Sequence, residues 1–246
     1  KPNIMFATPC YGGVINTTTM MNYLNMTRNL DYLDISYDVR LLSNESMVTK
    51  ARNKLVEYFL EDNYTHLMFI DSDMGFHYET ILKLLNFDKP IVGCTYPVKK
   101  INWPKIIKNL KSIKDIKDLL KYSFRYINDI NIKSGEFEKI DWLPTGFMLI
   151  KKEVFIKMMK EQPDKFYIPD YHTHDFKYQD KKHYDFFEAG VHHGEIRGKT
   201  GMRYYGEDSY FCKKWTDMGG EIWVYNPKHK LTHIGNTWFG ESAKIT

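Results

Sequence analysis

The first hundred residues alternate between short apolar runs and segments whose apolar residues recur at helical spacing, and this alternation constrains the fold more than any other feature. Strands that alternate with helices along the chain form a mainly parallel sheet covered on both faces. The sequence therefore predicts an α/β, Rossmann-like fold. The pattern places strands at 4–8, 37–42, 66–70 and 91–96, and helices at 17–30, 47–60 and 79–85.

A lysine-rich segment interrupts the alternation at residue 99. Eight lysines against two aspartates between residues 99 and 121 give a local net charge of +6, so the rest of the chain, whose total is +4, sums to −2. Isoleucines and leucines recur at helical spacing from residue 106 to 120, which predicts an amphipathic, lysine-coated helix. We expect a single domain over 1–246 with first half 1–98, a helical insertion at 99–140, and second half 141–246.

The second half is less regular. An apolar stretch at 142–150 surrounds Pro144-Thr145-Gly146, and residues 169–205 are rich in His, Tyr and Gly with little periodicity. A loop of that length in a compact domain is usually functional or mobile. The remaining pattern predicts helices at 153–160 and 206–218 and closing strands at 222–225 and 231–234.

Composition narrows the class of protein. With 43% hydrophobic and 15% aromatic residues, the chain can bury a core, which excludes disordered and collagen-like proteins. The sequence contains no run of about 18 consecutive apolar residues, so it predicts no transmembrane helix. The three cysteines are far apart and form no C-x-x-C pair, so we expect free thiols in a reducing compartment, the cytoplasm, or the host cytoplasm if the protein is viral.

The sharpest motif is Asp71-Ser72-Asp73, directly after the apolar run at 66–70. Two carboxylates held this close repel each other unless a cation lies between them, and hard divalent ions prefer such oxygens. Ligands in open α/β sheets bind at the carboxyl ends of strands. Two interpretations remain open at this point: a divalent-cation site, or a strand-end aspartate followed by a helix cap.

Two further sites carry candidate chemistry. Gly206-Glu207-Asp208 opens a predicted helix, where Asp208 can act as a general base or only as a helix cap. His233, at the end of the last predicted strand, can be a third ligand beside a carboxylate for a Mn²⁺-like ion, or a structural histidine.

The exit of the first strand, Thr8-Pro9-Cys10-Tyr11-Gly12-Gly13, has paired glycines that let backbone approach a nucleotide or a phosphate closely. It contains neither G-x-G-x-x-G nor the Walker pattern, so it supports neither a dinucleotide site nor a P-loop. Arg52, one of only six arginines, can pair with a phosphate, with a carboxylate or in an ordinary surface salt bridge.

The order of these motifs along the chain is more specific than any one of them. The chain resembles a GT-A glycosyltransferase over most of its length and is similar to the small viral and bacteriophage-type, nucleotide-sugar-dependent enzymes of that superfamily. The resemblance implies a GT-A-like fold in which 1–98 is the nucleotide-binding half and 141–246 the acceptor and catalytic half. It also implies a donor of the UDP- or GDP-sugar type and a glycan or other hydroxyl acceptor.

The resemblance assigns roles to particular residues. Mn²⁺ or Mg²⁺ would be bound by Asp71, Asp73 and His233, with Asp208 as catalytic base and Glu207 holding donor or acceptor hydroxyls. Donor-binding residues would be Thr8, Pro9, Cys10, Tyr11, Arg52, Asp71, Ser72, Asp73, Thr145 and Gly146. The implied reaction is a metal-dependent transfer of a sugar to a hydroxyl with inversion, and retention stays an alternative because the sequence does not fix the placement of the carboxylates.

Two other functions are compatible with parts of the pattern. A sugar-nucleotide-binding module without transfer activity would not need both the Asp73/His233 pair and Asp208. A metal-dependent nucleotidyltransferase or phosphoesterase would need more clustered carboxylates than the one pair found. The charge of the chain does not demand nucleic acid, and residues 103–121 predict at most a peripheral contact with a membrane, because their aromatic residues are few.

Overall fold

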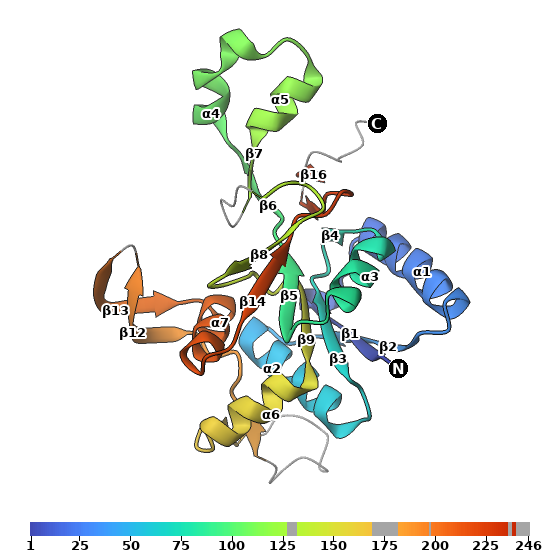
Figure 1. The fold of residues 1–246 in the computed structure, drawn as a ribbon, viewed down its shortest axis with the longest axis vertical. Coiled ribbons are helices and arrows are strands. Elements are labelled where there is room, and N and C mark those ends of the chain that lie inside the picture. Colours follow the sequence, from blue (N-terminus) through green and yellow to red (C-terminus); the bar gives the residue numbers. More distant parts are fainter. Residues whose placement is uncertain (127–131, 169–181, 197, 236–237, 240–246) are drawn as a thin grey trace.

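The computed structural model describes residues 1–126, 132–168, 182–196, 198–235 and 238–239 of the 246-residue chain. A seven-stranded sheet lies at its centre, in the order β2-β1-β3-β9-β5-β14-β8 (Figure 1). Five of these strands point the same way, and β9 and β8 are antiparallel to them. The strands are β1 (Asn3–Cys10), β2 (Ser36–Ser43), β3 (His66–Ile70), β5 (Ile91–Cys94), β8 (Phe137–Ile140), β9 (Phe147–Lys151) and β14 (Ile222–Tyr225).

Helices cover both faces of this sheet, and each face has its own apolar core. On one face, Phe59, Phe155 and Phe211 are fully buried and belong to a core that α2, α6 and α7 share with the sheet. On the other face, Met26 and Ile81 bring α1 and α3 onto a second core. The helices are α1 (Thr17–Tyr32), α2 (Val48–Glu61), α3 (Tyr78–Phe87), α6 (Lys152–Glu161) and α7 (Glu207–Asp217).

The predicted fold class is confirmed: the chain is α/β, with a GT-A-like, Rossmann-like central sheet in which most strands are parallel and both faces are covered by helices. β3 illustrates why the sequence predicted this fold class well. Its last four residues are all buried, because helices cover both sides of the strand, and such a strand has a continuous apolar run in place of alternation.

The lysine-rich insertion projects away from the sheet (Figure 1). It is helical, as predicted, but the one expected helix is divided into α4 (Trp103–Lys108), a 3-10 turn (Leu110–Ser112) and α5 (Ile116–Ser123), carried on β6 (Pro97–Ile101) and β7 (Phe124–Tyr126). The division has a local cause, since Asp115 accepts the backbone N–H of Asp118 and so starts a new helix. β8, which the predicted division assigns to the insertion, pairs with β14 in the central sheet, and that division stays a prediction.

The predicted long loop at 169–205 is only partly a loop. Residues 169–181 lie outside the described residues, but β12 (Gly190–Ile196) and β13 (Lys199–Tyr205) form an antiparallel hairpin. Sequence reasoning missed it because Val191, Met202 and Tyr204 are exposed, so this ribbon shows no apolar alternation. The segment also contributes β11 (His183–Tyr184), which pairs with β10 (Phe166–Tyr167).

A second, three-stranded sheet stands at the edge of the domain and matters for the site. Its order is β16-β15-β4, and in it β4 (Met74–Gly75), β15 (Thr232–Ile234) and β16 (Trp238–Phe239) bring the segment after β3 beside the end of the chain. Within the described part of the chain, none of the helices is long and apolar enough to cross a membrane.

Candidate active site

A cleft of about 320 Å³ opens at the carboxyl ends of β1 and β3, where ligands bind in open α/β sheets. The order of the central sheet makes β1 and β3 neighbours, so the loops that follow them face each other. The cleft is lined by residues from β1 and its exit, the start of α2, the segment after β3, and β15, among them Pro9, Tyr11, Arg52, Asp71, Ser72, Asp73 and His233.

Asp73 and His233 meet because β4 and β15 are antiparallel neighbours. His233 pairs with Met74 in the strand register, and the N–H of Ile234 donates to the carbonyl of Asp73 over 2.8 Å. The side chains then approach to 3.4 Å between His233 Nε2 and Asp73 Oδ1. The other ring nitrogen, Nδ1, lies 3.0 Å from the carbonyl oxygen of Pro97. Because a carbonyl oxygen only accepts, the ring proton is assigned to Nδ1, and Nε2 keeps the lone pair with which it can bind a metal ion.

Lys99 is a further partner of Asp73. It lies on β6, and its ammonium forms an ion pair with Asp73. Burial would raise the pKa of Asp73, but the interactions with His233 and Lys99 outweigh burial and lower it. The carboxylate of Asp73 is therefore held ionised beside a ring nitrogen of His233.

Asp71 belongs to a different ion pair. Its Oδ1 lies 2.9 Å from Nη2 of the buried Arg52, whose Nε lies 3.4 Å from Oε1 of Glu207. Arg52 also stacks over Phe69, with 5.2 Å between the guanidinium carbon and the ring centroid. One guanidinium on α2 thus links the carboxylate after β3 to the carboxylate that begins α7. Its remaining nitrogen, Nη1, is buried and has no hydrogen-bond partner among the described residues.

Gly146 lets the wall of the site come close to these carboxylates. Its carbonyl accepts the N–H of Asp71 over 3.0 Å, and its own N–H donates to the hydroxyl of Tyr96 over 3.2 Å. A Cβ at this position would stand 2.2 Å from the Tyr96 hydroxyl and 2.7 Å from Asp71 Oδ2, so only glycine fits. Thr145, beside it, is buried.

Asp208 lies in the first turn of α7, close enough to Tyr96 and Arg52 for charge interactions. Burial, reinforced by the neighbouring Glu207 carboxylate, raises the pKa of Asp208 to about 6. A carboxylate with a pKa just below neutrality is ionised at pH 7 and still basic enough to accept a proton, which are the properties of a general base.

Most of the predicted site residues lie together, with clear exceptions. Side chains alternate along β1, so Pro9 faces the cleft while Thr8 and Cys10 face the core. The Thr8 hydroxyl is fully buried and bonds to that of Tyr23 over 2.7 Å, and Cys10 is buried as well. The side chains of Thr8 and Cys10 are therefore not among those that line the cleft, and their part in donor binding stays a prediction.

The predicted metal ligands divide in the same way. Asp73 and His233 lie together, whereas Asp71 is paired with Arg52 and does not join them in a three-ligand group among the described residues. Direct ligation by Asp71 stays a prediction.

Two functional candidates were not predicted as such. Lys99 was counted only as part of the basic run, and Tyr96 only as the end of a strand. The signal that could have found them is position: both follow β5, whose carboxyl end points to the same edge of the sheet as those of β1 and β3.

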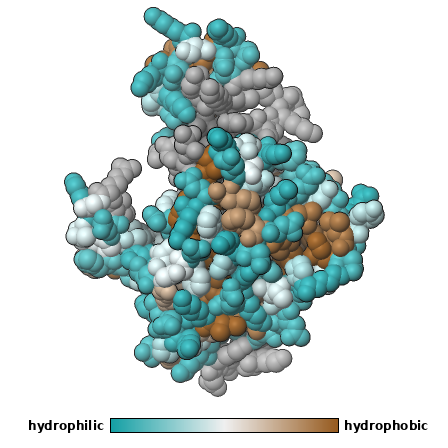
Figure 2. All heavy atoms as spheres, in the orientation of Figure 1, coloured by the Kyte–Doolittle hydropathy of each residue, from teal (hydrophilic) through white to brown (hydrophobic). Residues whose placement is uncertain are grey.

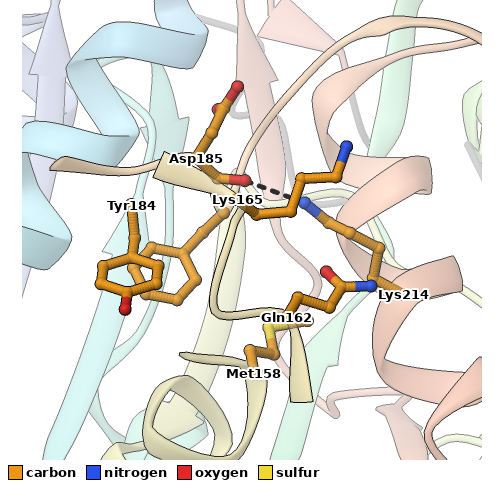
Figure 3. A pocket seen from close by; sticks show the side chains of 7 residues that line it. Met158, Gln162, Lys165, Tyr184, Asp185 and Lys214 are labelled. Carbon is orange, nitrogen blue, oxygen red and sulfur yellow. Dashed lines mark hydrogen bonds between the residues drawn. The ribbon is translucent and has the colours of Figure 1, made fainter. Parts of the chain in front are cut away.

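A second cleft of about 780 Å³ lies next to the first, and Val48 lines both. Val48 and the carboxylate-bearing segment at Gly206-Glu207 line it together with Tyr167 and Tyr204. Its wall at 183–188 is anchored by Lys214 of α7, whose buried ammonium donates to the carbonyl of Asp185 over 2.9 Å (Figure 3). Burial lowers the pKa of Lys214 to about 8.

Comparison with solved structures supports the fold. A197 from STIV is similar over 98% of this chain and 92% of that chain, with a TM-score of 0.51 and 16% identity. A putative glucose-1-phosphate thymidylyltransferase from Bacillus anthracis (TM-score 0.33, 13% identity, 65% and 74% of the two chains) is also similar. So is a glycosyltransferase involved in glycosylation of the major capsid of PBCV-1 (TM-score 0.29, 11% identity, 67% and 68%).

These likenesses carry different weight. The match to A197 spans nearly the whole of both chains and shows a shared fold, whereas the other two TM-scores are too low to carry an argument. No protein-family model matches the chain. No curated protein sequence matches it either.

The raised pKa of Asp208 predicts a stability effect. Its folded-state pKa of about 6 exceeds the ordinary 3.8, so stability falls as pH rises from about 4 to 6 and stays lower above that range. We expect Asp208→Asn to increase the free energy of unfolding at pH 8 by on the order of 1–3 kcal/mol and to have little effect at pH 3.5. Urea titrations at both pH values measure this, with Asp217→Asn on the exposed side of α7 as control. A lower free energy of unfolding for the Asp208→Asn protein at pH 8 would contradict the interpretation.

Proposed function

We propose that this protein is a metal-dependent glycosyltransferase that moves a sugar from a nucleoside-diphosphate sugar to an acceptor hydroxyl with inversion. The observation that carries the proposal is the meeting of Asp73 and His233, 160 positions apart in the chain, at 3.4 Å beside a cleft at the carboxyl ends of the parallel strands. A carboxylate oxygen and an imidazole nitrogen at that separation suit two ligands of one divalent cation.

The residues present fit such a cation. Asp73 is held ionised, and His233 presents Nε2 because its Nδ1 is bonded to Pro97. A nitrogen ligand beside a carboxylate favours Mn²⁺ over Mg²⁺, which prefers oxygen. When bound there, the cation would neutralise the charge that develops on the departing diphosphate.

Donor binding follows from the groups that remain free in the cleft. Tyr11 is 77% exposed and can stack on the base of a nucleotide. The unpartnered Nη1 of Arg52 can donate to a donor oxygen, and Gly146 packs closely against Asp71, so that it can hold that carboxylate in place beside the donor sugar. Ser72 and Pro9 line the same cleft.

The acceptor would enter through the second cleft, which shares Val48 with the donor cleft. Exposed Ile168 and Tyr204 there offer the apolar faces on which sugar rings pack, which suits a glycan acceptor. Asp208 would take the proton of the attacking hydroxyl. A single displacement from the face opposite the diphosphate inverts the anomeric carbon.

The rival functions lack support in the site. A nucleotidyltransferase or phosphoesterase that uses two cations needs carboxylates bridging them about 3.5–4 Å apart. Among the described residues, Asp71 and Glu207 are both engaged by Arg52 and so are not placed for a second cation. A binding module without activity has no use for a carboxylate whose pKa is raised to about 6.

The proposal predicts separate effects for base and ligand. Asp208→Asn should leave nucleotide binding intact and reduce transfer by about 10²–10⁴-fold, and wild-type transfer should rise with pH through about 6 as Asp208 ionises. Asp73→Asn should remove the Mn²⁺-dependent increase in melting temperature produced by a panel of UDP- and GDP-sugars. If no nucleotide sugar shifts the wild-type melting temperature with or without Mn²⁺, the proposed function is wrong.

We also propose that Lys99 binds the donor diphosphate beside the cation ligand Asp73. Its ammonium already rests on Asp73, so it stands where phosphate oxygens would arrive. In the free protein the same ammonium competes with a metal ion for that carboxylate.

Lys99→Met should therefore act in opposite directions on two ligands. It should weaken binding of a nucleoside diphosphate in the absence of metal and strengthen binding of Mn²⁺ alone, each by about tenfold, the size of one lost charge-assisted hydrogen bond. Calorimetry measures both. Lys100→Met, the next residue on β6 and equally cationic, is the control and should change neither. Parallel losses for both ligands would indicate a merely structural role.

For the insertion we propose peripheral contact with an anionic membrane surface. Trp103, Ile107 and Leu110 follow one another at helical spacing and are 60%, 65% and 58% exposed, beside exposed lysines at 105, 108, 111 and 114. Figure 2 shows the insertion as a mainly hydrophilic projection with a few hydrophobic residues at its surface. Apolar side chains framed by lysines match the boundary between acyl chains and anionic headgroups.

Vesicle sedimentation tests this contact. We expect the wild-type protein to sediment with phosphatidylserine-containing vesicles, and Ile107→Asp to reduce the bound fraction several-fold. Ile156→Asp, which changes an equally apolar and 52% exposed residue on α6, should have no effect. Equal behaviour of the two variants, or binding to neutral vesicles alone, would refute the membrane contact.

A further inference from the structure

A second group of metal-binding side chains lies outside the proposed active site. His77 precedes α3, Glu79 lies in its first turn, and His229 belongs to the loop between β14 and β15. Among the described residues, these three are the group whose ligand atoms all lie within 4.8 Å of one another. Nothing in the proposed transfer reaction uses them.

The distances within this group suit a tetrahedral ion. Glu79 Oε2 lies 3.7 Å from His77 Nδ1 and 3.4 Å from His229 Nε2. Ligands bound at about 2.0–2.1 Å to a tetrahedral Zn²⁺ stand about 3.3 Å from each other. Small side-chain rotations would therefore bring the three atoms onto one ion.

The chemistry of the three atoms agrees with the distances. The Nδ1 atom of His77 is buried and has no hydrogen-bond partner among the described residues, although an imidazole nitrogen in that position normally has one. The two imidazole rings are 4.6 Å apart and inclined by 30°, with Glu79 beside both. Two imidazoles and one carboxylate are a ligand set of zinc sites that leaves a fourth position open.

The pairing of β4 with β15 brings together both this group and the active-site residues Asp73 and His233. β4 and β15 are antiparallel, with Gly75 opposite Thr232 and Met74 opposite His233. Asp73 and His233 therefore meet at one end of the pair, and His77 and His229, each four residues away along its own segment, meet beyond the other end. Figure 1 shows β4 close to the start of α3.

We propose that His77, Glu79 and His229 bind Zn²⁺ or a similar borderline divalent ion, and that this ion fastens the 226–231 loop to the start of α3. The fastening would fix the chain just before β15 and, through it, the position of His233. The proposal needs neither a nucleotide nor transfer activity.

Calorimetry with Zn²⁺ alone tests the site. The measurements use the full chain carrying His233→Gln, so that the active-site pair does not contribute. We expect one Zn²⁺ per chain and a higher melting temperature in the presence of Zn²⁺. Adding His229→Ala should lower the affinity at least tenfold and remove the thermal shift.

Two controls keep the outcome decisive. His193→Ala changes an exposed histidine of the β12–β13 hairpin and should leave Zn²⁺ binding unchanged. Glu79→Gln keeps the shape of the side chain and should weaken binding, so a folding defect cannot imitate the result. Equal Zn²⁺ affinity in the His229→Ala and His193→Ala proteins would overturn the proposal. Loss of nucleotide-sugar binding with the zinc site intact would count against the proposed function alone.

Discussion

The buried guanidinium of Arg52 is the interaction on which the rest of the site depends. It receives Asp71 from the strand side and Glu207 from the helix side, and so joins the two halves of the domain at the cleft. Removing one partner from such a group would leave a charge uncompensated in a buried place, which is strongly destabilising. The position of Glu207, and with it that of Asp208 next in the chain, follows from this link.

The short pair of β4 and β15 plays a comparable part on the other side of the cleft. Two backbone segments that are distant in sequence are joined there. Asp73 gains His233 in this way, and His77 gains His229. A strand of two residues would contribute little stability alone, yet it brings these side chains together.

Local chemistry explains where prediction from sequence succeeded and failed. β3 and β14 were predicted with their observed bounds, because a strand buried on both faces has an uninterrupted apolar run between polar residues. The hairpin of β12 and β13 was missed, because strands with both faces in contact with solvent lack that signal. The predicted single helix of the insertion is divided, because Asp115 caps a new helix.

The sequence by itself determined the α/β class, the order of the elements and the presence of carboxylates at strand and helix ends, since these depend on periodicity and on nearest neighbours. Only the tertiary structure decided that Asp71 pairs with Arg52 while Asp73 pairs with His233 and Lys99, and that Thr8 and Cys10 face the core. Such pairings depend on strand order and on the alternation of side chains at one sheet edge, which bring together residues that no spacing along the chain connects.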